Sequence, residues 1–291
     1  MEEKNRNMIT LNLINPAESG IVYQLKTLPD GEPQIMLQTI DLCYDQPCKI
    51  ITRLSSPNDI LLLLFAKNAL EYAGFSDIEL CVSYLLTARM DRQMHPGEAF
   101  SLKVVATLIN NSHFKKVSVF DAHSDVTAAV IDNCSIVSNE VFVQDSIKAF
   151  ELQNPTVEKS KFCLVSPDAG ALKKIYKVAQ SISDIEVVEC IKNRNPHTGK
   201  LSGFKVFSKE LRGRVCFLVD DICDSGRTIV GVAAALKELH AEKIIFIVSH
   251  GIFSKGIPLQ NVDEIFCTDS YKPLTSVKGE LTVMNVLKYL S

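Results

Sequence analysis

The sequence predicts an α/β fold with two similar halves, and three observations lead to this assignment. Short apolar runs alternate with segments of helical periodicity through most of the 291 residues, which is typical of a parallel sheet covered by helices. The apolar runs show little polar alternation, as expected of strands that are buried on both faces. A strand with acidic residues at its end, a small turn and a helix follow one another twice, at residues 162–179 and 215–239.

The individual elements follow from these patterns. The expected strands are residues 78–85, 117–120, 162–166, 215–219 and 244–248. Helices are expected where apolar residues recur three and four positions apart, at residues 57–72, 99–108, 169–179 and 229–239. The apolar pattern weakens at residues 139–156, so we divide the chain there into domains of residues 1–146 and 147–291. The polar, basic segment 193–210 contains Gly and Pro, and we expect a mobile loop there.

Composition and charge favour a small-molecule partner. The formal charge of -3 and the even mixing of basic and acidic residues argue against nucleic acid or an anionic membrane surface as the partner. The longest apolar stretch, residues 60–66, is too short to span a membrane. No secretory signal is expected, and the 9 cysteines lack CxxC spacing and lie mostly in apolar runs. We therefore expect a cytoplasmic protein with reduced thiols and no zinc site.

The strongest local signal is VCFLVDDICDSGRTIVGVAAAL at residues 215–236. A buried strand brings Asp220 and Asp221 to its carboxyl end, and a short turn precedes a helix. Backbone N–H groups at such a helix start, with the positive end of the helix dipole behind them, can bind a phosphate. The two carboxylates can accept hydrogen bonds from ribose hydroxyls. The alternative is an ordinary helix capped by Asp224 or Ser225.

This segment resembles the fingerprint of type I phosphoribosyltransferases and of ribose-phosphate diphosphokinases (PRPP synthetases). The resemblance implies two phosphoribosyltransferase-like domains, each a mainly parallel sheet flanked by helices. It also implies a ribose-phosphate site in the second domain. The residues of that site are Asp220, Asp221, Asp224, Ser225, Gly226, Arg227 and Thr228.

Further motifs resemble the PRPP synthetases and occur in that family's order. TLPDGE at residues 27–32 is similar to a segment that contacts adenine from a neighbouring subunit. TARMDRQ at residues 87–93 is similar to the ATP-binding segment of the first domain. The resemblance therefore implies ATP contacts by Leu28, Asp30, Glu32, Arg89 and Asp91. It also implies a homodimer at least, or a hexamer.

The remaining motifs imply magnesium and catalytic residues. FDAHSD at residues 120–125 matches a strand-end motif in which His123 contacts magnesium and the ATP triphosphate. VSPDAGALKK makes Asp168 a second implied magnesium residue. IKNRN supplies Lys192 and Arg194, the basic pair of the catalytic loop.

The implied reaction is a Mg²⁺-dependent transfer of the β,γ-diphosphate of ATP to the C1 hydroxyl of ribose 5-phosphate, which gives PRPP and AMP. Such a transfer places charge on phosphoryl oxygens, so catalysis depends on positioning and on positive charge. Lys192 and Arg194 would supply the positive charge, since lysine is a compact cation and arginine forms bidentate phosphate contacts.

Three positions depart from the family pattern and bear on the choice of substrate and activity. Met90 replaces a glutamine of the ATP segment, Ala171 replaces a glycine after Asp168, and Arg227 stands where a small residue is usual. A guanidinium at Arg227 could add an anion contact, so a larger acceptor such as ADP-ribose is a second hypothesis. The sequence also leaves open a PRPP-consuming phosphoribosyltransferase and a non-catalytic regulatory paralogue.

Overall fold

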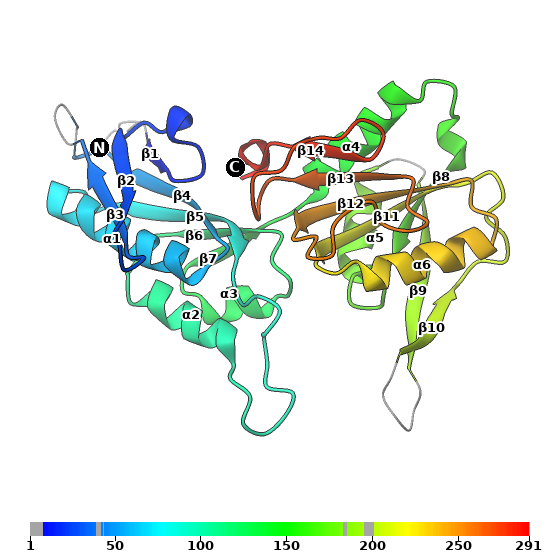
Figure 1. The fold of residues 1–291 in the computed structure, drawn as a ribbon, viewed down its shortest axis with the longest axis horizontal. Helices are drawn as coiled ribbons and strands as arrows, with labels where there is room; N and C mark the ends of the chain where they lie inside the picture. The colour runs from blue at the N-terminus through cyan, green and yellow to red at the C-terminus, as the bar shows by residue number, and fades with distance from the viewer. Residues whose placement is uncertain (1–7, 39–41, 43, 183–184, 195–200, 291) are drawn as a thin grey trace, which may run out of the picture. The chain divides into compact units, whose positions relative to one another are not determined.

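The computed structural model describes residues 8–38, 42, 44–182, 185–194 and 201–290, and it divides the chain into two compact units (Figure 1). The first unit comprises Met1–Val137 with Leu290–Ser291, and the second comprises Ser138–Tyr289. The predicted boundary at 146/147 lies inside helix α4 (Glu140–Gln153). This helix belongs to the second unit, because Phe150 packs edge-on against Phe162 and Phe217 at ring centroid distances of 5.9 and 5.4 Å.

The first unit is built on a five-stranded parallel sheet with the strand order β1-β4-β5-β6-β7. Its strands are β1 (Ile9–Asn12), β4 (Cys48–Leu54), β5 (Ile78–Leu85), β6 (Val117–Phe120) and β7 (Cys134–Val137). Its helices are η1 (Pro16–Glu18), α1 (Pro57–Ala73), α2 (Ser101–Asn110) and α3 (Val126–Val130). An antiparallel hairpin of β2 (Tyr23–Thr27) and β3 (Pro33–Leu37) lies between β1 and β4 in the sequence.

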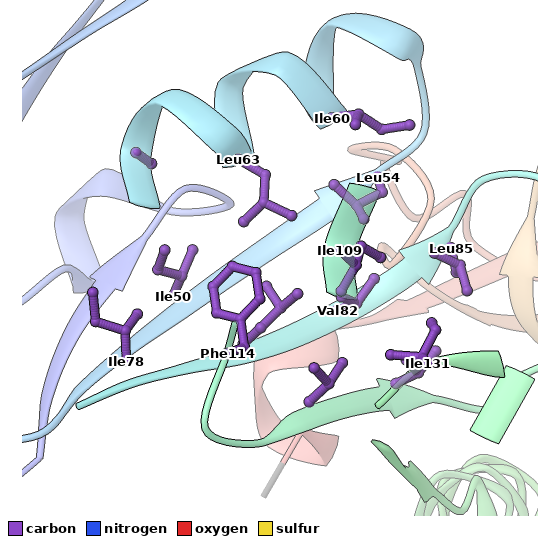
Figure 2. Packing of buried hydrophobic residues seen from close by; sticks show 14 of the residues in the cluster. Ile50, Leu54, Ile60, Leu63, Ile78, Val82, Leu85, Ile109, Phe114 and Ile131 are labelled. Carbon is purple, nitrogen blue, oxygen red and sulfur yellow. The ribbon is translucent and has the colours of Figure 1, made fainter. Parts of the chain in front are cut away.

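Helix α1 shows how the sequence fixes an element of this unit. Ser56 and Asp59 form a capping box, in which the Ser56 hydroxyl accepts from the Asp59 amide at 3.3 Å and the Asp59 carboxylate accepts from the Ser56 amide at 2.7 Å. Gly74 ends the helix in the left-handed conformation. Leu63 then projects from α1 toward the sheet, where Ile50 and Val82 are buried (Figure 2).

The second unit is built on a seven-stranded sheet with the order β10-β9-β8-β11-β12-β13-β14. Its strands are β8 (Phe162–Ser166), β9 (Glu186–Arg194), β10 (Leu201–Val206), β11 (Val215–Cys223), β12 (Lys243–Gly251), β13 (Glu264–Thr268) and β14 (Leu281–Met284). Its further helices are η2 (Lys159–Lys161), α5 (Leu172–Gln180), α6 (Arg227–Glu238) and η3 (Val286–Tyr289). All neighbouring strands are parallel except β9 and β10. The predicted α/β class is therefore confirmed.

Two predicted elements of the second unit differ from the structure. Helix α5 begins at Leu172 instead of residue 169, because the Asp168 carboxylate accepts hydrogen bonds from the Gly170 and Ala171 amides and holds a turn there. The segment expected to be a mobile loop, 193–210, contains strand β10, which pairs antiparallel with β9. Residues 195–200 of that segment lie outside the described residues.

The described cysteines are largely enclosed by the two cores. The buried free thiols are those of Cys48, Cys81, Cys163, Cys190, Cys216, Cys223 and Cys267. Most of them lie on the sheets, where the strands are covered on both faces. In the part of the chain that the structure describes, no helix combines the length and apolar character needed to cross a bilayer.

Candidate active site

The sheet of the second unit changes its winding direction between β8 and β11. The chain crosses from β8 to β9 in one direction and from β11 to β12 in the other. Right-handed crossovers therefore put α5 and α6 on opposite faces of the sheet. In open α/β sheets, ligands bind at the carboxyl ends of the strands at such a reversal. Asp168 follows β8, and Asp220 and Asp221 lie near the end of β11.

The two adjacent carboxylates lie where β11 extends beyond β8. Strand β11 pairs with β8 only as far as Leu218, whereas its pairing with β12 continues to Cys223. Asp220 and Asp221 are half-buried in this extension. Asp220 Oδ1 accepts from the Asp221 amide at 2.9 Å. Burial and the neighbouring Asp221 raise the pKa of Asp220 well above its usual range, and Asp168 adds to the effect.

The turn after β11 presents the amino end of α6. Gly226 is the N-cap residue with φ of 71°, and a Cβ atom there would lie 2.6 Å from a Leu259 methyl group, so both conformation and space require glycine. As the N-cap residue, Gly226 has no side chain with which to cap this helix end. The structure therefore differs from an ordinary helix capped by Asp224 or Ser225. The N–H groups of the first helical turn lack intrahelical acceptors and can bind an anion.

The polar side chains of this turn surround the helix end. Ser225 and Thr228 are half-buried, whereas Arg227 is exposed. The Arg227 Nε donates to the Ser225 hydroxyl at 3.4 Å. The Asp224 carbonyl accepts from the Ser254 amide at 3.0 Å and ties the turn to the segment that follows β12. The predicted ribose-phosphate residues are thus contiguous in space as well as in sequence.

The structure brings together two residues predicted from separate motifs, Asp168 and Lys192. Lys192 Nζ donates to Asp168 Oδ2 at 2.5 Å, and the side chains of Lys192 and Asp168 are 27% and 29% exposed, respectively. The other carboxylate oxygen of Asp168 accepts from the Gly170 and Ala171 amides at 3.0 and 3.2 Å. Lys192 therefore lies at the same strand ends as the carboxylates. The backbone of Arg194 ends β9, but its side chain lies outside the described residues.

The predicted nucleotide residues of the first unit follow β5 and β6, which are neighbouring parallel strands. Asp91 is 6% exposed and forms a bidentate pair with Arg92 at 2.8 and 3.1 Å. The Arg92 hydrogen bonds lower the pKa of Asp91, and Ser124 and His123 act in the same direction. The two predicted motifs therefore meet at Asp91, whereas Arg89 and His123 are exposed.

Sequence reasoning missed two threonine hydroxyls and two strained residues in this region. The hydroxyls of Thr87 and Thr127 are buried, and the described residues provide neither with a hydrogen-bond partner. Thr87 has φ of 68° and Asp121 has φ of 39°, a conformation that is uncommon for residues other than glycine. Strain of this kind is often retained at binding sites. Backbone strain has no sequence signature, so only the position of Thr87 within TARMDRQ could have drawn attention to it.

The predicted adenine contacts lie at the tip of the β2–β3 hairpin. The Leu28 amide donates to the Glu32 carbonyl and the Gly31 amide donates to the Leu28 carbonyl, both at 2.9 Å. Asp30 and Glu32 are at the surface of this tip. Asn58 of α1 donates to the Gly31 carbonyl at 3.2 Å and supports the tip. The structure thus leaves this segment accessible.

The donor chemistry of the second unit suits magnesium. Asp168 and Asp220 influence each other electrostatically, and carboxylate oxygens are the ligands that Mg²⁺ prefers. Within the described residues, no group of three or more His, Cys, Asp or Glu side chains is arranged to hold a metal ion. A site of this kind fits the usual mode of Mg²⁺ binding, in which one or two carboxylates act together with substrate phosphates.

The fold and the site define an α/β protein whose second unit is of the phosphoribosyltransferase type. The family model described as "Phosphoribosyl transferase domain" matches residues 135–271. The crystal structure of phosphoribosylpyrophosphate synthetase from Mycobacterium smegmatis superimposes with a TM-score of 0.79 over 97% of this chain and 95% of that one, at 19% identity. This likeness extends the shared fold to both units.

Curated relatives identify the family. The ribose-phosphate pyrophosphokinase of Mycoplasmopsis pulmonis is 30% identical over 90% of this chain and 81% of its own length. That of Hyphomonas neptunium is 29% identical over 86% of this chain and 79% of its own. The chain belongs to the ribose-phosphate pyrophosphokinase family. The family resemblance found in the motifs is therefore confirmed.

Proposed function

We propose that this protein is a Mg²⁺-dependent enzyme that transfers the β,γ-diphosphate of ATP to the C1 hydroxyl of ribose 5-phosphate, forming PRPP and AMP. The observation that supports it most is the turn before α6, whose amides lie beside Asp168, Asp220 and Asp221 where the sheet changes its winding direction between β8 and β11. The chain is also related over most of its length to ribose-phosphate pyrophosphokinases. A simple phosphoribosyltransferase leaves the relationship of the first unit unexplained. The relatives described above are named ribose-phosphate pyrophosphokinases, which supports neither that activity nor a regulatory paralogue.

The residues of the second unit have distinct proposed roles toward the acceptor. The amides at the start of α6, with Ser225 and Thr228, bind the 5′-phosphate. Asp220 and Asp221 accept hydrogen bonds from the ribose hydroxyls and fix the ring. Lys192 lies 2.5 Å from Asp168, so its ammonium is positioned to stabilise charge on the transferred phosphoryl groups. Arg194 is proposed to act with it.

The residues of the first unit are proposed to bind ATP. Arg89 and His123 are exposed after neighbouring strands and can contact the triphosphate. Asp91, fixed by Arg92, accepts from donors of the nucleotide. Asp168 in the second unit and His123 in the first are each proposed to contact magnesium, which together with the substrate phosphates would neutralise phosphoryl charge.

The oligomeric state and the cellular compartment of the protein are also proposed. The hairpin tip with Leu28, Asp30 and Glu32 is available to contact adenine in a neighbouring copy, so we propose a homodimer or a hexamer. The buried free thiols fit a reducing compartment, and we propose that the protein acts in the cytoplasm.

A product assay tests the proposed reaction. The protein is incubated with ATP, Mg²⁺ and ribose 5-phosphate, and AMP is separated from ADP. AMP in equal amount to a C1-diphosphorylated sugar is the expected result, because the diphosphate leaves as a unit. ADP would indicate γ-phosphoryl transfer and contradict the proposal. Replacing ribose 5-phosphate by ADP-ribose tests the acceptor. We expect faster AMP release with ribose 5-phosphate, since the relatives described above are named ribose-phosphate pyrophosphokinases.

A further inference from the structure

The β9–β10 hairpin carries two side chains that contact different parts of the second unit. Lys192 on β9 and Phe204 on β10 are direct partners in the antiparallel register. Side chains of directly opposed residues project from the same face of a strand pair and lie close together. The ladder therefore holds the backbone of Phe204 directly beside that of Lys192.

Phe204 packs against helix α6 at Gly231. A Cβ atom on Gly231 would lie 2.2 Å from Cε2 and 2.8 Å from Cδ2 of the Phe204 ring, distances that no packed structure tolerates. Only glycine therefore leaves room for the ring. Gly231 lies in the interior of α6, where glycine is less favourable than alanine. The contact with Phe204 explains why glycine is nevertheless present at this position.

Lys192 makes the second contact of the same hairpin. Its ammonium is 2.5 Å from Asp168 Oδ2, in the turn that follows β8. Phe204 thus fixes the hairpin on α6. Lys192 lies at the carboxyl ends of β8 and β11, beside the turn that precedes α6. The neighbouring Phe207, in contrast, is 53% exposed.

We propose that the Phe204–Gly231 contact positions Lys192 for catalysis, with Phe204 as a positioning residue that touches no reacting atom. This inference rests on the proposed function, because it assigns Lys192 a role in the transfer. The contact sets the distance of the ammonium from the acceptor site. Its loss lowers the rate of the chemical step more than it weakens the binding of ribose 5-phosphate, which depends on the α6 turn.

The test compares F204A, G231A and the double variant with the wild type, using F207A as the matched control. Steady-state kinetics give kcat and KM for ribose 5-phosphate. Hydrogen exchange measures protection of the hairpin amides, and circular dichroism measures the folded fraction. We expect F204A and G231A each to lower kcat at least about tenfold with KM within about twofold, and to increase exchange in β9 and β10. F207A should keep wild-type values.

Two relations between the variants make the test specific. In G231A the new methyl group displaces the ring, and in the double variant there is no ring to displace. The double variant should therefore be no slower than F204A, because both substitutions break one contact. F204L, which keeps apolar bulk, should recover part of kcat.

Several outcomes would overturn the proposal. Wild-type kcat in F204A with increased hairpin exchange would show that the contact does not position Lys192. A loss of kcat that merely follows the folded fraction, or additive effects in the double variant, would assign Phe204 a structural role only. If the wild type releases no AMP, the proposed function fails. Independently of activity, unchanged hydrogen exchange in β9 and β10 of F204A would show that the Phe204–Gly231 contact does not hold the hairpin on α6.

Discussion

The pKa values of two carboxylates, Asp220 and Asp91, are shifted in opposite directions by their neighbours. Asp220 has a raised pKa because of burial and the adjacent Asp221, whereas Asp91 has a lowered pKa because of its bidentate pair with Arg92. The first arrangement places two acidic groups side by side where a cation or hydroxyl donors are expected. The second stabilises a charged acceptor in a nearly buried position. Both arrangements reduce the freedom of the side chains before substrate binds.

The raised pKa of Asp220 predicts a pH dependence of stability. The folded protein binds this proton more tightly than the unfolded chain, so the contribution of Asp220 to stability falls as pH rises from the ordinary aspartate range through the folded pKa. D220N should raise the melting temperature at neutral pH without Mg²⁺ and flatten this dependence, while lowering activity. Thermal melts across pH check it. If the melting temperature of D220N depends on pH as steeply as that of the wild type, Asp220 is not the source of this pH dependence.

The lowered pKa of Asp91 predicts the effect of removing Arg92. R92A leaves a nearly buried carboxylate without its main partner, so the pKa of Asp91 should rise and its orientation should loosen. We expect KM for ATP to increase on the order of tenfold, with little change in KM for ribose 5-phosphate. K103A, which removes an exposed cation from α2, is the control. Equal effects on both KM values would exclude a role specific to the nucleotide.

At the scale of elements, both units place chemistry at the carboxyl ends of neighbouring parallel strands. The strands themselves could be predicted, because β8 is buried at every position and such strands give uniformly apolar runs. The sequence pattern does not predict the short strands β1 and β7, since Thr10, Asn12 and Ser135 interrupt their apolar character. The strands β2, β3, β4, β9, β13 and β14 are also absent from the prediction. The sequence predicts a loop where β10 lies, because the pairing of β10 with β9 and its contact with α6 leave no local pattern in a polar, glycine-containing segment.

The turn before α6 gives a prediction at this scale. G226A adds a methyl group at φ of 71° and 2.6 Å from Leu259, so the turn must shift and its amides lose their common direction. We expect KM for ribose 5-phosphate to rise at least about tenfold. G213A is a matched control, because Gly213 has φ of 72° but its nearest atom, in Glu242, is 3.9 Å away. If G213A raises KM equally, backbone strain alone explains the effect.

At the scale of the whole molecule, the candidate residues belong to two units, and the motifs predicted both sets. The order of the motifs in the sequence predicted Asp168, Lys192 and the turn before α6 as one site. This was possible because the carboxyl ends of parallel strands meet where the sheet changes its winding direction. The pairing of Asp168 with Lys192 and the contact of Phe204 with Gly231 could not be predicted, since the first depends on how β9 pairs with β8 and the second on how β10 pairs with β9. The roles of the site residues stay predictions that the experiments must decide.

The proposed catalytic pair gives the most direct test of the complete enzyme. K192A/R194A removes both cations while leaving the α6 turn and the Asp91 pair intact. AMP formation should fall by at least about a hundredfold, and calorimetry should still detect binding of ATP and ribose 5-phosphate. Turnover at the wild-type rate in this variant would remove Lys192 and Arg194 from the mechanism.

The proposed assembly has its own test, which uses complementation between inactive variants. D30A/E32A alters the hairpin tip, and K192A alters the acceptor side. If adenine is contacted by a neighbouring copy, a mixture of the two variants regains part of the activity that each lacks alone, because some mixed dimers contain one intact site. No recovery after subunit exchange, verified by native mass spectrometry, would contradict a shared site.

The enclosed thiols make the two cores separately observable. Cys48 and Cys81 belong to the first unit, and the remaining enclosed cysteines, such as Cys163 and Cys267, belong to the second. A thiol-reactive dye can modify them only when the surrounding structure opens. Peptide mapping after timed labelling therefore follows the opening of each core independently. The same experiment with each substrate present would reveal which core that substrate protects, without any engineered probe.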